Sequence, residues 1–245
     1  MYFNVSDNLK YLLIEKISLK DIKTLMYLKK VPLKIQKKVI DKGSLNIRFI
    51  QNPSEETKVA AVSKWGYSIR YIDFPSERVQ LAAIRQTGFS FSSIKKPTYA
   101  VQLAAVISVP SNIGYIKNPS EELMKIAVES GYFWAIRNPT PEIQLKSVKL
   151  NGHNLEFIID KNLFLQKCAV LKTPESIQYI EFPSEEIQLL AVAENPTVIQ
   201  YIRFPCLLAQ RKVIQVCPRF IEFIEIPAPE IIELAVTLNP RIVYS

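Results

Sequence analysis

The stretch Pro53-Ser-Glu-Glu-Thr-Lys-Val-Ala-Ala-Val62 recurs along the chain and decides how the rest is read. Successive copies start 22 residues apart, apart from one step of 20 residues. Self-similarity at a short fixed period is the signature of a repeat architecture, in which each unit packs on its neighbours. Close copies begin at Pro75 and Pro183, and looser ones at Pro97, Pro119, Pro139, Lys161, Pro205 and Pro227.

Each copy carries the signals of a helix start. Proline suits the first turn of a helix or the residue before it, and the Ser or Thr that follows can cap the free amides. The glutamates come next, where the helix dipole favours negative charge. Apolar residues then follow at helical spacing around a small residue, as in Val79, Ala83 and Ile84. This pattern predicts an amphipathic helix of about three turns whose small residue lets a neighbouring helix approach closely.

A glycine or proline 13 residues after every repeat start but Pro119 predicts the end of that helix. Glycine would end it through a left-handed conformation and proline through its missing donor. Two apolar columns three residues apart then predict a second, shorter helix. The sequence therefore predicts an all-α fold, a right-handed α-solenoid of about ten 22-residue helix-turn-helix repeats resembling HEAT or TPR superhelices. The second column is isoleucine in every copy: Ile50, Ile72, Ile94, Ile116, Ile136, Ile158, Ile180, Ile202 and Ile224.

Two regions are expected along the chain. Residues 1–30 should form a basic N-terminal helical cap, in which Leu9, Leu13 and Ile17 share one helix face. Residues 31–245 should form the repeat array, with an irregular stretch around 130–165. There one unit is two residues short, and the next begins with Lys161 in place of proline.

Composition narrows the class of protein. A hydrophobic content of 48% excludes a disordered chain, and no apolar run is long enough to span a membrane. The first residues lack the apolar core of a signal peptide, so we expect a cytoplasmic protein of the producing or host cell. Cys168, Cys206 and Cys217 show no paired spacing and are expected to be partly buried thiols in a reducing compartment.

The net charge of +8 is concentrated at the N-terminal end. Residues 1–50 hold eleven Lys and Arg against four Asp and Glu, whereas residues 51–245 hold twenty against nineteen. Basic side chains that contact phosphates would make the first 50 residues a nucleic-acid-binding region. The candidate basic patch consists of Lys29, Lys30, Lys34, Lys37 and Lys38.

Catalytic chemistry has little support in the sequence. The single histidine, His153, follows Gly152 at an inter-helix turn and is expected to be a surface residue. Most carboxylates fall at helix starts, where capping explains them. Phosphate-binding loops, dinucleotide-binding glycine clusters and metal-ligand spacings do not occur in the sequence. We therefore expect a protein that is not an enzyme and needs no cofactor or metal.

Candidate partner-binding residues are those that differ from the residues at the same position of the other repeats, or that carry charge at that position. Trp134 stands in a polar column and Trp65 in a column of Thr and Asn, so each is either an exposed binding anchor or buried by local bending. The same column is basic in three consecutive units, with Lys95, Lys117 and Arg137. These residues form either a docking stripe for an anionic partner or a solvated face.

A glutamine column offers a further candidate. Five residues after the repeat start, glutamine recurs in seven units, and it would either form a structural amide ladder or line the concave face. The ladder is the favoured interpretation. The glutamines kept as candidate partner contacts are Gln80, Gln102 and Gln144.

The pattern from Ala61 to Ile84, Ala-Val-x-x-x-Gly-x-x-Ile-x-Tyr-Ile followed by Pro-Ser-Glu and Gln-Leu-Ala-Ala, resembles a known repeat. It is similar to the short helical repeat filed as domain of unknown function 4116, which occurs in bacterial, phage and large-virus proteins. The resemblance covers residues 31–245. It implies a helical repeat, without catalytic residues or an agreed activity, and a viral or bacterial origin.

Three hypotheses about function follow. The first is a non-enzymatic protein-binding scaffold, a viral or bacterial effector or inhibitor that captures a host protein on its concave face. The second is nucleic-acid binding through the basic N-terminal region. The third is an enzyme or small-ligand binder of undetected type, with a pocket in the irregular region.

Overall fold

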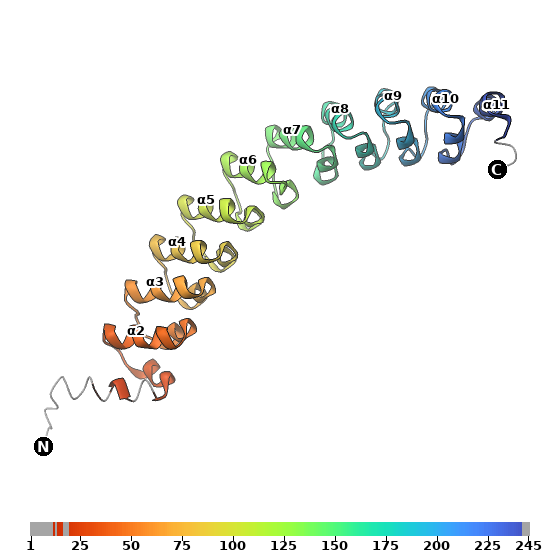
Figure 1. Ribbon diagram of the computed structural model, residues 1–245. Helices are drawn as coiled ribbons and strands as arrows, with labels where there is room; N and C mark the ends of the chain where they lie inside the picture. The colour runs from red at the N-terminus through yellow and green to blue at the C-terminus, as the bar shows by residue number, and fades with distance from the viewer. Residues whose placement is uncertain (1–11, 13, 17–19, 242–245) are drawn as a thin grey trace, which may run out of the picture. The chain divides into compact units, whose positions relative to one another are not determined.

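The computed structural model describes residues 12, 14–16 and 20–241. Over these residues the chain is helical and has no β-strand, and two kinds of helix alternate along it (Figure 1). This confirms the predicted all-α fold built from repeated helix-turn-helix units, an α-solenoid. The α-helices of the described part are α2 (Leu33–Lys42), α3 (Glu55–Lys64), α4 (Glu77–Gln86), α5 (Tyr99–Ser108), α6 (Glu121–Glu129), α7 (Pro141–Leu150), α8 (Leu163–Lys172), α9 (Glu185–Glu194), α10 (Leu207–Val216) and α11 (Pro229–Leu238).

The second helix of each repeat is a 3₁₀-helix. The N–H of Ile72 donates to the carbonyl of Ile69 at 3.0 Å, the i to i+3 bond of this helix type. Three residues make one 3₁₀ turn, so the two apolar columns three residues apart share a face, and both residues here are buried. The 3₁₀-helices are η1 (Ile22–Tyr27), η2 (Ser44–Phe49), η3 (Gly66–Tyr71), η4 (Gly88–Ser93), η5 (Pro110–Tyr115), η6 (Phe133–Ala135), η7 (Gly152–Phe157), η8 (Pro174–Tyr179), η9 (Pro196–Tyr201) and η10 (Pro218–Phe223).

The predicted helix caps are confirmed. In α3 to α7 and in α9 the proline lies just outside the helix, and the Ser or Thr after it is the N-cap, whose oxygen accepts the N–H three residues further on. The helices α10 and α11 begin after Cys206 and Ala228, without a side-chain cap. In α3 the N–H of Thr57 donates to Ser54 Oγ at 3.3 Å. In the unit that begins with Lys161, Asn162 takes over and accepts the N–H of Leu165 at 3.0 Å. The other predicted caps are Ser76, Thr98, Ser120, Thr140 and Ser184.

The glycines after the helices have a different role from the one predicted. Gly66, Gly88 and Gly152 do not have a left-handed backbone, so they do not end the helices in that way. They are needed because the next repeat comes very close. A Cβ atom on Gly152 would lie 2.3 Å from the carbonyl oxygen of Ala169 in α8. The glycine therefore permits close packing between repeats.

The chain divides into two compact units, unit 1 with residues 1–119 and unit 2 with residues 120–245. Within each unit, α-helices pack on the α-helices of neighbouring repeats and 3₁₀-helices pack on 3₁₀-helices, which makes two layers. Fully buried small residues such as Ala61, Ala83 and Ala105 line the α layer. Near the N-terminus η1 packs on η2 and buries Leu25. The predicted stripe of Leu9, Leu13 and Ile17 lies outside the described residues.

The shortened repeat lies at the start of unit 2. Here α6 has 9 residues and η6 only 3, where most repeats have 10 and 6. The helix ends through Gly131, whose φ of 82° lets the N–H of Tyr132 reach the carbonyl of Ala127 at 2.8 Å. This is the left-handed helix ending that glycine favours. Both helices of the unit are therefore shorter, whereas the link between them, residues 130–132, is longer than the single residue Trp65 between α3 and η3.

Candidate functional site

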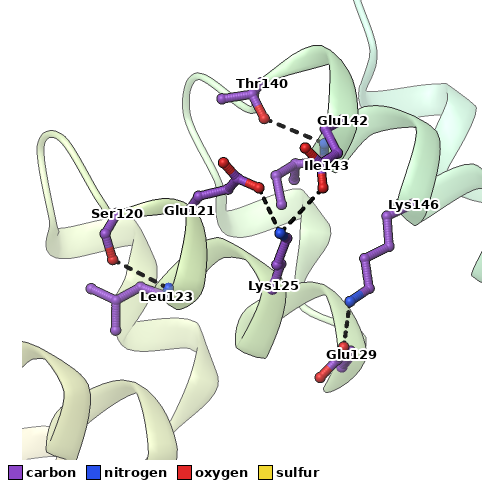
Figure 2. A network of polar contacts seen from close by, with 9 residues as sticks. All are labelled: Ser120, Glu121, Leu123, Lys125, Glu129, Thr140, Glu142, Ile143 and Lys146. Atoms are coloured by element: carbon purple, nitrogen blue, oxygen red, sulfur yellow. Dashed lines mark hydrogen bonds and ion pairs between the residues drawn. The ribbon is translucent and has the colours of Figure 1, made fainter.

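Carboxylates at the helix starts join neighbouring repeats. Lys125 in α6 contacts Glu121 at 2.6 Å and Glu142 of α7 at 3.2 Å, and its side chain lies between the two acids (Figure 2). The hydrogen bond from Lys125 lowers the pKa of Glu121, and the same contacts raise the pKa of Lys125. A second ion pair joins Lys146 of α7 to Glu129 of α6 (Figure 2). The Lys125–Glu142 and Lys146–Glu129 pairs therefore link α6 to α7.

In unit 1 the capping hydroxyls make similar joints. Ser76 donates its hydroxyl to Glu55 of the preceding helix, and Thr98 donates to Glu77 one repeat further on. Each cap thus satisfies its own helix and holds the helix before it. The acids at these helix starts have structural partners.

The glutamines of the column bond backbone groups at the repeat junctions, and we call each such side chain a glutamine bracket. Nε2 of Gln188 donates to the carbonyl of Pro183 at 3.0 Å, and its Oε1 accepts the N–H of Cys206 at 2.7 Å. Each glutamine therefore holds the loop before its own helix and, in several repeats, the cap of the next one. The predicted amide ladder was wrong, since the amides bond backbone groups and not one another. The same donation to the residue five positions back is made by Gln36, Gln80, Gln102, Gln144, Gln166 and Gln210.

Both tryptophans are surface residues. Trp134 in η6 is 57% exposed, and its ring centroid lies 6.1 Å from that of Tyr132. Trp65 follows α3, is 36% exposed, and lies 5.6 Å from the ring of Tyr67. Of the two arrangements expected for each residue, the structure shows the exposed one. Their part in binding stays a prediction.

The predicted basic residues are all exposed. Lys95 and Lys117 lie in unit 1, whereas Arg137 lies in unit 2, so the structure does not place them in one stripe. Lys38 forms an ion pair with Glu15. The N-terminal patch of Lys29, Lys30, Lys34, Lys37 and Lys38 lies before and along α2.

His153 is half-buried and not the surface residue predicted. The close approach at Gly152 brings η7 against η8, so the His153 ring meets the Tyr179 ring edge-on at 5.9 Å. Nδ1 of His153 is buried without a hydrogen-bond partner. Burial raises the pKa of Tyr179, and the negative charge of Glu156 raises it further.

The cysteines are free and half-buried, as expected of structural thiols. Within the described ranges, His, Cys, Asp and Glu do not gather in a group of three or more that could hold a metal ion. Among the helices described, none is long and apolar enough to cross a membrane.

The most exposed apolar residues lie on the loops between repeats. We call the residues between one α-helix and the next N-cap a turn segment, and the exposed side chains of a unit's turn segments its turn surface. In three consecutive repeats of unit 2, the residue before the repeat proline is large and apolar. These are Phe182, Phe204 and Ile226, exposed to 74%, 63% and 74%. Sequence reasoning missed them, although a large apolar residue in a loop column was a visible signal.

The turn surface of unit 1 contains two pockets, one repeat apart. The first, of about 450 Å³, is lined by the turn segments 43–53 and 65–75, including Arg48, Phe49 and Tyr71, and by Met26 of η1 and Lys58 of α3. The second, of about 290 Å³, is lined by the turn segments 65–75 and 87–97, including Arg70 and the predicted residue Lys95, and by the predicted residue Gln80 of α4. The structure thus places two predicted candidates, Lys95 and Gln80, at one site.

A comparison of the chain with protein-family models, with curated proteins and with solved structures found no match.

Proposed function

We propose that this protein is a non-enzymatic binding scaffold that captures a protein partner on its turn surface. The observation that carries the proposal is the row of Phe182, Phe204 and Ile226, each largely exposed at the same position of successive repeats. Large exposed aromatic residues are frequent binding anchors. The repeat supplies the regular spacing of such anchors, because every unit presents the same loop position.

The charged groups of the scaffold support a structural rather than a catalytic role. Glu55, Glu77 and Glu142 each bond a side chain of a neighbouring repeat. A catalytic site needs a nucleophile, a base and an orienting group that converge. These acids are instead distributed one per joint along the α layer.

The resemblance to the domain of unknown function 4116 repeat extends the proposal. It favours a viral or bacterial effector or inhibitor that acts on a host protein in the cytoplasm. Binding would then inhibit by steric capture alone, without chemistry on the partner.

The test is capture of a partner from a native host lysate by the immobilised full chain. We expect one protein at stoichiometric amount, lost with the double variant Phe182→Ser/Phe204→Ser and weakened by Trp134→Ala. The matched control is Leu150→Ser/Leu171→Ser, which removes two exposed leucines from the α-helices of the same unit. Recovery of no protein, or equal loss with both double variants, would contradict the proposal.

Nucleic-acid binding through residues 1–50 is the second candidate. It is favoured by α2, which holds four lysines against Asp41, with Lys34 and Lys37 both exposed. Phosphate contacts make affinity fall steeply as salt rises. A gel-shift titration with duplex and single-stranded DNA at low salt tests it, and no shift in either would end this candidate.

A further inference from the structure

We propose that the turn surface of unit 1 binds an acidic, extended segment of the partner protein, with one carboxylate held near Arg48 and another near Arg70. This inference rests on the scaffold function proposed above and names the chemistry of its partner.

The two pockets are equivalent sites of consecutive repeats. Arg48 in the first and Arg70 in the second occupy the same repeat position, 22 residues apart. Ile72 and Asp73 line both pockets, so the two sites adjoin. Packed helices lie about 8–10 Å apart, and an extended chain advances about 3.3 Å per residue. A bound extended segment would therefore present about one residue in three to each successive pocket.

Each arginine is held by an aromatic ring. The guanidinium of Arg48 lies 4.6 Å from the ring centroid of Phe49 and 5.9 Å from that of Tyr71, while that of Arg70 lies 5.4 Å from that of Tyr67. Within the described part of the chain, neither guanidinium forms an ion pair with a carboxylate. Stacking orients the planar group and leaves its N–H donors for a carboxylate ligand.

The charge of the surface selects an acidic partner. The turn segments of unit 1 hold five basic residues and one acid, a net charge of +4: Arg48, Arg70, Lys95, Lys96 and Lys117 against Asp73. Those of unit 2 hold four basic residues and six acids, a net of −2: Arg137, Lys161, Arg203 and Arg219 against Glu156, Asp160, Glu175, Glu181, Glu222 and Glu225. Complementary charge steers association and excludes partners of the wrong sign. The same loops therefore attract acids in unit 1 alone.

The lining favours a peptide over a nucleic acid. The Arg48 guanidinium lies over the Phe49 and Tyr71 rings that bases would need for stacking. The buried residues Ile47, Ile50 and Ile72 contribute to the first pocket and suit an aliphatic side chain between two acids.

A left-handed backbone recurs at the same two pockets. Asn52 and Phe74 are the non-glycine residues with a positive φ in the described chain, at 49° and 47°. They share one repeat position, and Asn52 lines the first pocket and Phe74 the second. Asn tolerates this backbone, whereas it strains Phe74, which is also 95% exposed. Such strain persists where the surroundings over-determine it, frequently at ligand-binding sites.

The test is fluorescence anisotropy with the full chain and a labelled peptide of four Glu-Leu-Ser triplets. We expect saturable binding that weakens at least tenfold with Arg48→Gln/Arg70→Gln. The control Arg203→Gln/Arg219→Gln removes the same charge from exposed arginines of the unit 2 turn surface and should leave binding within twofold. A peptide of Lys-Leu-Ser triplets should not bind, and an isomer with its four glutamates clustered at one end should bind more weakly.

Three results would overturn the inference: no binding of the acidic peptide, equal weakening by both double variants, or tighter binding of a single-stranded oligonucleotide that displaces the peptide. The last would assign the site to nucleic acid. The lysate capture separates this inference from the scaffold function. A partner still captured by Arg48→Gln/Arg70→Gln would refute the acidic segment and leave the scaffold in place.

Discussion

Removing one glutamine bracket should destabilise the array. Gln188 is 6% exposed and makes two short hydrogen bonds, at 3.0 Å to the Pro183 carbonyl and at 2.7 Å from the Cys206 N–H, besides a long one of 3.5 Å to the Phe204 carbonyl. Gln188→Ala leaves the Pro183 carbonyl and the Cys206 N–H without that partner, and an unpaired buried group costs about 1–3 kcal/mol. Pro183 and Cys206 are half-buried, so water reaches part of each group. We therefore expect a loss of about 2–3 kcal/mol in the free energy of unfolding.

Urea unfolding followed by circular dichroism measures this loss, and hydrogen exchange at the Cys206 amide locates it. Exchange is needed because repeat arrays can unfold in parts, so one transition need not describe the whole chain. The control Gln200→Ala removes an exposed glutamine that bonds only the Thr197 carbonyl three residues back, at 3.1 Å. It should change stability by less than about 0.5 kcal/mol.

A second variant separates the two bonds of the bracket. Gln188→Glu keeps the acceptor for the Cys206 N–H and turns the donor into a carboxylate oxygen that faces the Pro183 carbonyl. It should protect the Cys206 amide from exchange better than Gln188→Ala does. If Gln188→Ala and Gln200→Ala unfold within about 0.5 kcal/mol of each other, the bracket does not hold the repeats together.

Three further predictions follow from single contacts. Gly152→Ala places a Cβ 2.3 Å from the Ala169 carbonyl oxygen and should cost about 1–3 kcal/mol in urea unfolding, whereas Gly43→Ala meets only the Asn46 side chain, at 3.2 Å, and should be nearly neutral. Phe74→Asn should stabilise the chain by about 1 kcal/mol, because Asn tolerates the left-handed backbone at this position. The control Phe182→Asn changes a residue without a positive φ and should not stabilise the chain. Equal effects of the two substitutions on stability would contradict backbone strain at Phe74. Lys125→Met should raise the pKa of Glu121 in an NMR titration, because the lysine holds that pKa low. In the wild type the pair's stabilisation should be present above the unfolded-state pKa of Glu121 and lost as pH falls through the lowered pKa; an unchanged Glu121 titration in the variant would refute the pairing.

The sequence predicted only part of the candidate site. The exposure of Lys95 could be read from its column, because a column shared by many repeats also shares its surroundings. For Trp134 the column left exposure and burial open, and the structure shows the exposed side chain. The two pockets could not, because each forms from turn segments of two consecutive repeats. Phe74 was missed for a similar reason, since its left-handed backbone depends on how two repeats meet.

The sequence alone determined the helices. Signals such as Ser54 before Glu55, or Ile69 three residues before Ile72, act within one turn of the chain, so local hydrogen bonding and periodicity carry them. The tertiary structure alone decided what Gln188 and Gly152 do. Their partners, the Cys206 N–H and the Ala169 carbonyl, lie 17–18 residues further along the chain, in the next repeat. The periodic pattern of the sequence shows where Gln188 and Gly152 recur but not which backbone group of the next repeat each one meets. Only the packing of the repeats shows those partners.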